Sequence, residues 1–285
     1  MGSDQKIADA QAARVRWFSR RQRLLTRLMG PFARLSVLDR IHFDKYSYPQ
    51  YAYGVYFACM QARMLGHEAT TVIEFGVAGG NGLVALEKAA SEVGDFFGVR
   101  VAVIGFDNGA GLPASEDLRY MIYWYQPTAF AMDEQGLRCR LNSATLHIGR
   151  ITDTLDEALG DLKGPIGFCA FDMDYYSSTR DALKIFEAPT ATRQPRVLIY
   201  ADDIFGYHDL NVTSCDVGEE FAFEEFNNRH SDAKIRPVRG LRYKRPVPAM
   251  WNDKIFALHD FSHPDYSRPI NPNEPEHATE LSSLR

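Results

Sequence analysis

The sequence contains no apolar run that approaches the length of a membrane span, and its first residues lack the apolar core of a signal peptide. The net charge of -5 at pH 7 leaves no basic excess to hold phosphates, which argues against a general nucleic-acid-binding protein. Cysteine is scarce and forms no C-x-x-C pair, so the cysteines are predicted to be free thiols and neither zinc ligands nor disulfides. They are Cys59, Cys139, Cys169 and Cys215. We therefore expect a cytoplasmic protein that has no membrane span and binds no nucleic acid.

The composition is that of a globular protein with an unusual N-terminal segment. With 285 residues, 45% of them hydrophobic and 24% charged, the chain can bury a sizeable core. Residues 11–40 interleave arginines with apolar residues, which predicts one or two amphipathic helices. This arm either meets an anionic membrane surface or an acidic substrate, or packs on its own domain or on a dimer mate. We favour packing, and expect a homo-oligomer.

Three segments are expected along the chain: a helical arm over residues 1–49, one large domain over 50–262 and a flexible tail over 263–285. Strands and helices alternate within the domain. This alternation predicts an α/β fold with a doubly wound, mostly parallel, seven-stranded sheet. The predicted strands cover residues 71–75, 99–106, 145–148, 166–171, 197–201, 235–238 and 254–258. The predicted helices cover residues 50–65, 82–93, 115–125, 153–159, 178–186 and 218–228. The last two strands can form an antiparallel hairpin at the sheet edge.

Four carboxylates follow two of the apolar strands. One strand leads into Asp172 and Asp174, and the next strand along the chain leads into Asp202 and Asp203. A right-handed parallel crossover joins the two strands, so the carboxylates lie at one sheet edge, where ligands of open α/β sheets bind. Like charges crowded there are costly unless a cation, or a substrate with many donors, neutralises them. One or two of these aspartates could instead be helix caps or turn residues, but not all four.

A glycine-rich turn follows the first predicted strand. It reads E-x-G-x-x-x-G from Glu74 through Gly76 to Gly80, and Gly82 stands where the next helix begins. Glycines let the backbone approach a ligand closely, and the helix N-terminus offers free N–H groups. A dinucleotide-binding loop would read G-x-G-x-x-G and hold a pyrophosphate. The acidic residue before the first glycine disfavours a pyrophosphate and favours a ligand with an ammonium or hydroxyls, such as S-adenosylmethionine; the alternative is an ordinary turn.

The second predicted strand ends at Asp107, at the position where a ribose-binding acid belongs. A carboxylate there can accept hydrogen bonds from both ribose hydroxyls. The alternative is a turn residue, because Asn108 and Gly109 follow and Asp and Asn favour turns.

Taken together, these segments resemble the class I S-adenosylmethionine-dependent methyltransferases, and more closely the macrocin O-methyltransferase family. The resemblance covers roughly residues 53–228 and is carried by residues 74–82, 105–113, 171–183 and 201–203. Its most specific part is the D-x-D-x-Y-x-S-T pattern that begins at Asp172. The arginine-rich N-terminus and the last strands depart from the family.

The resemblance implies roles for the acidic residues. In that family an acid after the fourth strand and an acidic pair after the fifth hold a divalent ion, usually magnesium, against a sugar diol. By position these residues look like Asp174, Asp202 and Asp203, and Asp172 would lie nearer the methionine part of the cofactor. The residues expected to bind S-adenosylmethionine are then Glu74, Gly76, Gly80, Gly82, Asp107 and Asp172.

The chemistry of methyl transfer adds candidates for the base. An oxygen lone pair must be aligned with the S–methyl bond and a proton removed, and a divalent ion that chelates neighbouring hydroxyls helps with both. Oxygen ligands suit Mg²⁺, whereas the lack of a His/Cys cluster argues against zinc or copper. The candidate bases are Asp174 and His208, although His208 could equally be a surface loop histidine.

The sequence therefore predicts an enzyme, an O-methyltransferase acting on a small polyhydroxylated acceptor such as a sugar, glycoside or related natural product, with Mg²⁺. A first alternative keeps the fold and the cofactor but needs no metal, and methylates nitrogen or oxygen. A nicotinamide-dependent oxidoreductase and a non-catalytic binding protein are further alternatives. Glu74 and the missing G-x-G-x-x-G oppose the oxidoreductase, and the set of four strand-end acids opposes the binding protein.

Overall fold

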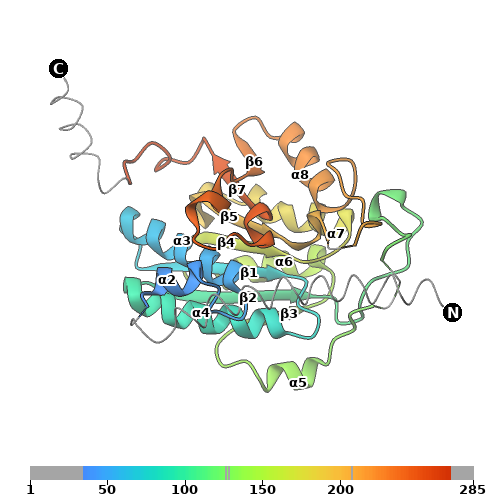
Figure 1. Cartoon of the computed structure of the whole chain (residues 1–285), viewed down its shortest axis with the longest axis horizontal. Helices are drawn as coiled ribbons and strands as arrows, with labels where there is room; N and C mark the ends of the chain where they lie inside the picture. The colour runs from blue at the N-terminus through green and yellow to red at the C-terminus, as the bar shows by residue number, and fades with distance from the viewer. Residues whose placement is uncertain (1–34, 126, 128, 207, 271–285) are drawn as a thin grey trace.

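A computed structural model describes residues 35–270 apart from residues 126, 128 and 207. Its centre is a seven-stranded sheet in the order β3-β2-β1-β4-β5-β7-β6, with helices on both faces (Figure 1). Strands β1 to β5 are parallel, and β7 runs antiparallel to both of its neighbours. The predicted fold class, a doubly wound and mostly parallel sheet, is confirmed.

The strands are β1 (Ala69–Phe75), β2 (Arg100–Asp107), β3 (Thr145–Ile148), β4 (Ile166–Phe171), β5 (Arg193–Ala201), β6 (Ala233–Pro237) and β7 (Ile255–Asp260). The described helices are α2 (Val37–His42), α3 (Pro49–Leu65), α4 (Asn81–Phe97), α5 (Glu134–Arg138), α6 (Ile151–Gly160), α7 (Tyr176–Ala182) and α8 (Gly218–Arg229). Short 3₁₀ turns occupy several connections, among them Asp202–Ile204 directly after β5.

The two central strands are buried on both faces, as expected of parallel strands covered by helices. The side chains of alternate residues pack into two separate hydrophobic cores, one on each face of the sheet. Val72 and Phe168 pack with α3 and α4, whereas Ile73 and Cys169 pack on the opposite face with α7 and α8. This near-continuous apolar pattern is why β1 and β4 were predictable from the sequence.

The sequence predicted β3 and β4 to the residue, and most other elements to within a few residues. The predicted antiparallel pairing of the last two strands is also present, with β7 inserted between β5 and β6. The helix predicted over residues 115–125 is wrong. Only the 3₁₀ turn Leu118–Tyr120 forms there, and Met121 follows it with a left-handed backbone (φ 50°), which a continuing helix cannot contain. Helix α5 was not predicted.

Both ends of the described segment pack on the domain. Arg245 donates to the backbone oxygens of Ile41 and His42 and pairs with Asp44, which ties α2 to the C-terminal part of the chain. Residues 1–34 of the predicted arm and 271–285 of the predicted tail lie outside the described residues. None of the described helices is long and apolar enough to cross a membrane.

The packing of α3 on β4 gives a stability prediction. A Cβ at Gly54 would lie 2.3 Å from the ring of Phe168, which is fully buried. Gly54→Ala should therefore lower the free energy of unfolding by about 1–2 kcal/mol, because overpacking outweighs the roughly 1 kcal/mol that alanine adds to a helix. Denaturant melts measure the change.

Gly160→Ala is the matched control. Gly160 ends α6, and a Cβ there meets no atom within 4 Å. This variant should be neutral or more stable by up to about 1 kcal/mol. Equal effects of the two substitutions would contradict the packing argument.

Candidate active site

A cavity of about 1540 Å³ opens at the carboxyl ends of the parallel strands. Its lining includes the turn between β1 and α4, the end of β2, the residues after β4 and β5, and the segment before β7. This is the edge where open α/β sheets bind their ligands, and the volume exceeds that of a pocket for one drug-sized molecule. The cavity therefore has room for two molecules side by side.

Close packing requires glycine at two positions, one in the turn between β1 and α4 and one in the first turn of α4. A Cβ at Gly76 would lie 1.8 Å from the backbone oxygen of Asp172, and the φ of Gly76 is +85°. A Cβ at Gly82 would lie 2.0 Å from Oε1 of Glu74. Gly80 also has a positive φ, of +78°. The predicted glycine positions thus shape the floor of the cavity.

Glu74 is a buried acid with one free oxygen. Its Oε1 accepts a hydrogen bond of 2.7 Å from the hydroxyl of Tyr51, and its Oε2 has no hydrogen-bond partner among the described residues. Only 2% of Glu74 is exposed, and burial raises the pKa of this carboxyl to about 8. A buried acceptor without a donor is costly, so Glu74 fits a ligand that brings an ammonium or hydroxyl group.

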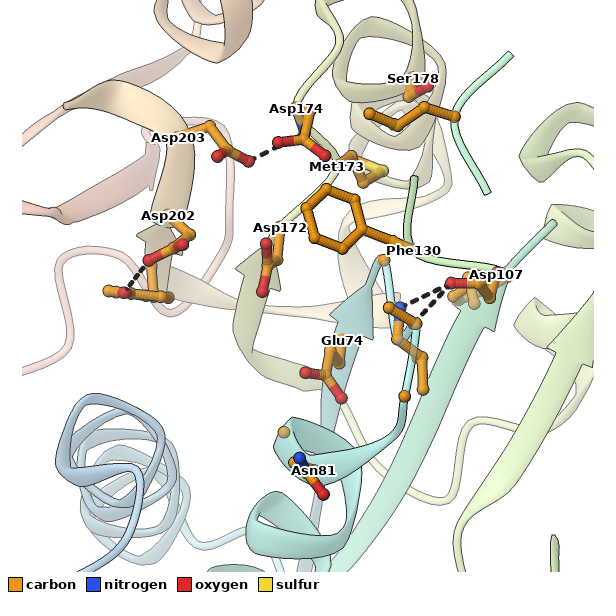
Figure 2. A pocket seen from close by; sticks show the side chains of 18 of the residues that line it. Glu74, Asn81, Asp107, Phe130, Asp172, Met173, Asp174, Ser178, Asp202 and Asp203 are labelled. Carbon is orange, nitrogen blue, oxygen red and sulfur yellow. Dashed lines mark hydrogen bonds between the residues drawn. The ribbon is translucent and has the colours of Figure 1, made fainter. Parts of the chain in front are cut away.

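Asp107 organises the same turn. Its Oδ2 accepts from the backbone N–H groups of Val77 (2.9 Å) and Ala78 (2.8 Å) (Figure 2). Its Oδ1 accepts from the backbone N–H of Gly109 at 2.6 Å. The turn role considered for Asp107 is therefore present. A carboxylate has about four lone-pair sites, so Asp107 retains capacity for a hydroxyl donor from the cavity.

Three carboxylates meet across the cavity from this turn. Each of Asp172, Asp202 and Asp203 offers an oxygen, and these oxygens lie within 4.8 Å of one another (Figure 2). Asp174 lines the same cavity but is outside this group, and its backbone N–H donates to Oδ2 of Asp203 at 2.9 Å. The structure thus confirms that the four strand-end acids share one sheet edge. Asp172 forms the oxygen group with the acidic pair, and Asp174 borders Asp203 through its backbone N–H; which of the two would join Asp202 and Asp203 on an ion stays a prediction.

Burial and neighbouring charge act together on these acids. Burial, and then the charge of Asp203, raises the pKa of Asp174 to about 9. Asp172 is open to the cavity, yet desolvation by the surrounding protein and the charge of Asp203 hold its pKa well above the ordinary value. Burial and the charge of Asp202 raise the pKa of Asp203. An oxygen-only donor set that repels itself in this way suits a hard cation such as Mg²⁺.

Several partners of the cluster were missed in the sequence. The Tyr125 hydroxyl donates to Oδ1 of Asp203 at 2.9 Å, and the backbone N–H of Asp203 donates to Glu219 at 3.2 Å. Glu219 is 1% exposed, in the first turn of α8, and its Oε1 has no hydrogen-bond partner among the described residues. Lys254, just before β7, contacts Asp202. Their contacts depend on how distant segments meet, and no local motif marks them.

His208 does not line the cavity. Its Nδ1 accepts from the backbone N–H of Leu210 at 3.0 Å, and its ring packs on Trp124 with the centroids 4.9 Å apart. Trp124 itself lines the cavity. The role of His208 as a base stays a prediction, and Asp174 is the candidate base that faces the cavity.

No protein-family model matches the sequence, and no curated protein matches it. Solved structures with similar folds include several methyltransferases. CalS11, a calicheamicin methyltransferase, is 16% identical over 85% of this chain and 91% of that chain, with a TM-score of 0.49. An O-methyltransferase from Bacillus cereus in complex with SAH is 13% identical over 80% of this chain and 92% of that chain, with a TM-score of 0.37. At these low values, a function for this chain has to be argued from its own residues.

The burial of Glu74 predicts a pH-dependent stability. Its folded pKa of about 8 exceeds the ordinary value of 4.5, so the folded state holds the proton more tightly and stability falls as pH rises from about 4.5 to 8. Glu74→Gln should remove this dependence. The variant should match the wild type near pH 4.5 and exceed it by on the order of 5 kcal/mol above pH 8.

Denaturant melts of both proteins across this pH range measure the difference. Glu68→Gln, at an exposed carboxyl, is the control and should leave the profile unchanged. A constant offset between wild type and Glu74→Gln would contradict the prediction.

Proposed function

We propose that this protein is an S-adenosylmethionine-dependent O-methyltransferase that methylates a hydroxyl of a small polyhydroxylated acceptor, with a divalent ion such as Mg²⁺ at the acceptor. One observation carries the proposal: the glycine turn with its unpartnered Glu74 oxygen and the Asp172–Asp202–Asp203 group line one cavity. In this proposal, the cavity would hold a cofactor half and an acceptor half side by side, as direct group transfer requires.

The residues of the cofactor half suit the parts of S-adenosylmethionine. Glu74 would accept from the ammonium of the methionine part, and Asp107 from the ribose hydroxyls. Gly76, Gly80 and Gly82 line the cavity, and their lack of side chains allows the close packing that holds the turn in place. When bound, S-adenosylmethionine supplies a methyl group on a positively charged sulfur. The surrounding carboxylates would stabilise this positive charge electrostatically.

In the acceptor half we assign Asp172, Asp202 and Asp203 to the ion, because their oxygens lie within 4.8 Å of one another. Asp172 thereby moves from the cofactor to the metal in our assignment. When bound, the ion would lower the pKa of a coordinated hydroxyl and fix its direction. Asp174 keeps the role of base, since it lines the cavity and borders Asp203.

A metal-independent methyltransferase is the second candidate. It is favoured by the contact of the Lys254 ammonium with Asp202, which already brings a positive charge to the acids. A chelator distinguishes the metal-dependent enzyme from the metal-independent one. Turnover of the metal-dependent enzyme stops when EDTA is added and returns when Mg²⁺ is restored. The homo-oligomeric state and the cytoplasmic location also stay predictions.

The cofactor assignment is tested at Asp107. Asp107→Asn removes the negative charge that accepts hydrogen bonds from the backbone amides of the turn. The dissociation constant for S-adenosylmethionine should therefore rise about tenfold or more, as expected when a charge-assisted hydrogen bond is lost. Isothermal titration calorimetry measures it. Asp95→Asn, at an exposed position on α4, is the control and should bind as the wild type does. Equal affinities would contradict the assignment.

The acceptor assignment is tested by replacing both Asp202 and Asp203 with Asn. Methyl transfer to a panel of trial glycosides should fall at least about 100-fold, because the acceptor loses its ligand set. The affinity for S-adenosylmethionine should change by less than about threefold, which is under 1 kcal/mol. Unchanged turnover would contradict the metal–diol mechanism. A loss of affinity for S-adenosylmethionine would instead indicate that Asp202 and Asp203 bind the cofactor.

A further inference from the structure

Lys254 brings a positive charge into the acidic cluster. Its Nζ donates to the backbone oxygen of Asp202 and, at 3.1 Å, to Oδ1 of the same residue. Lys254 is only 9% exposed, and the ammonium lies 5.2 Å from the centroid of the Phe205 ring. A lysine so deeply buried needs such partners, because an unpaired ammonium out of water is very costly.

The sheet topology fixes this lysine at the site. Strand β7 is antiparallel to β5, with Tyr200 opposite Ile255, so the residue before β7 stands beside the end of β5. The backbone oxygen of Lys254 accepts from Ala201 at 3.0 Å, and its N–H donates to Trp251 at 3.1 Å. The position of the ammonium is therefore set by backbone contacts on both sides.

The contact leaves Asp202 with one unoccupied oxygen. Oδ1 receives the hydroxyl of Tyr200 as well as the ammonium of Lys254. In the part of the chain that the structure describes, no donor reaches Oδ2. Asp202 is thus held to offer a single oxygen to a ligand, next to the carboxylates of Asp172 and Asp203.

We propose that Lys254 is a positioning residue of the acceptor site, a resident counter-cation that limits Asp202 to one ligating oxygen and weakens the binding of a divalent cation. This inference rests on the proposed function. An ammonium fixed on a ligating carboxylate repels an incoming cation, and the repulsion is strong where protein replaces water. The acids thereby stay partly neutralised without the ion, and the ion stays exchangeable.

Removing the charge should therefore tighten cation binding. Lys254→Met removes the charge and keeps most of the side-chain length. Its dissociation constant for Mg²⁺ should be at least about tenfold lower than that of the wild type. Calorimetry on the full chain measures both constants. Lys254→Arg keeps the charge and should stay within about threefold of the wild type. Lys244→Met, at an exposed lysine, should leave the constant unchanged.

A purely structural role predicts the opposite pattern. If Lys254 only ties β7 to the end of β5, Lys254→Met lowers the melting temperature and leaves the Mg²⁺ affinity unchanged or weaker, which overturns the proposal. Lys254→Gln is the second variant, because its amide can still donate to the Asp202 backbone while the charge is gone. Like Lys254→Met, this variant should bind Mg²⁺ more tightly than the wild type does.

The titrations also separate this inference from the proposed function. If the wild type binds Mg²⁺ and both neutral variants bind it with the same affinity, the inference is overturned and the proposed function stands. Binding only to the neutral variants supports the inference and removes the metal from the wild-type mechanism. No Mg²⁺ binding to any of the proteins overturns both.

Discussion

Mutual repulsion among carboxylates at one sheet edge is the constraint on which the site depends. Asp172, Asp202 and Asp203 approach within 4.8 Å because the ends of β4 and β5 are neighbours in the sheet. Left alone, such charges would favour separation or protonation. The surrounding protein supplies donors instead: the N–H of Asp174 and the hydroxyl of Tyr125 reach Asp203. The cluster is thus held together by hydrogen bonds that leave further oxygens directed at the cavity.

The antiparallel seventh strand adds a cation to these neutral donors. In a fully parallel sheet, every strand would present its carboxyl end to the cavity. Because β7 runs the other way, its N-terminal side lies at that edge and Lys254 meets Asp202. The topology of the sheet therefore determines the local charge balance. In our proposal, the same sheet order puts the cofactor half, at β1 and β2, next to the acceptor half, at β4 and β5 (Figure 1).

The sequence predicted those features that local patterns encode. Buried strands are continuous apolar runs, and the acids at their ends follow directly in the chain, so Glu74, Asp107 and the four aspartates could be named in advance. Glu219 and Lys254 could not, because each reaches the site through an element whose place in the sheet or over it is a tertiary property. The wrong helix over residues 115–125 has a related cause. Its segment is held by contacts such as the Tyr125–Asp203 hydrogen bond, which override helix propensity.

The D-x-D spacing shows why a motif alone does not assign a ligand set. In an extended strand, Asp172 and Asp174 would point to the same side, and both would join the acidic pair. Strand β4 ends before them, at Phe171, and Asp174 takes a left-handed backbone with φ 60°. The alternation of side chains is broken at that point, so the backbone N–H of Asp174 faces Asp203 while Asp172 supplies the third carboxylate. A strained backbone in a non-glycine residue at a candidate site is consistent with a functional constraint. Here it accompanies a difference between two acids that are two residues apart: Asp172 joins the oxygen cluster, and Asp174 stands beside it.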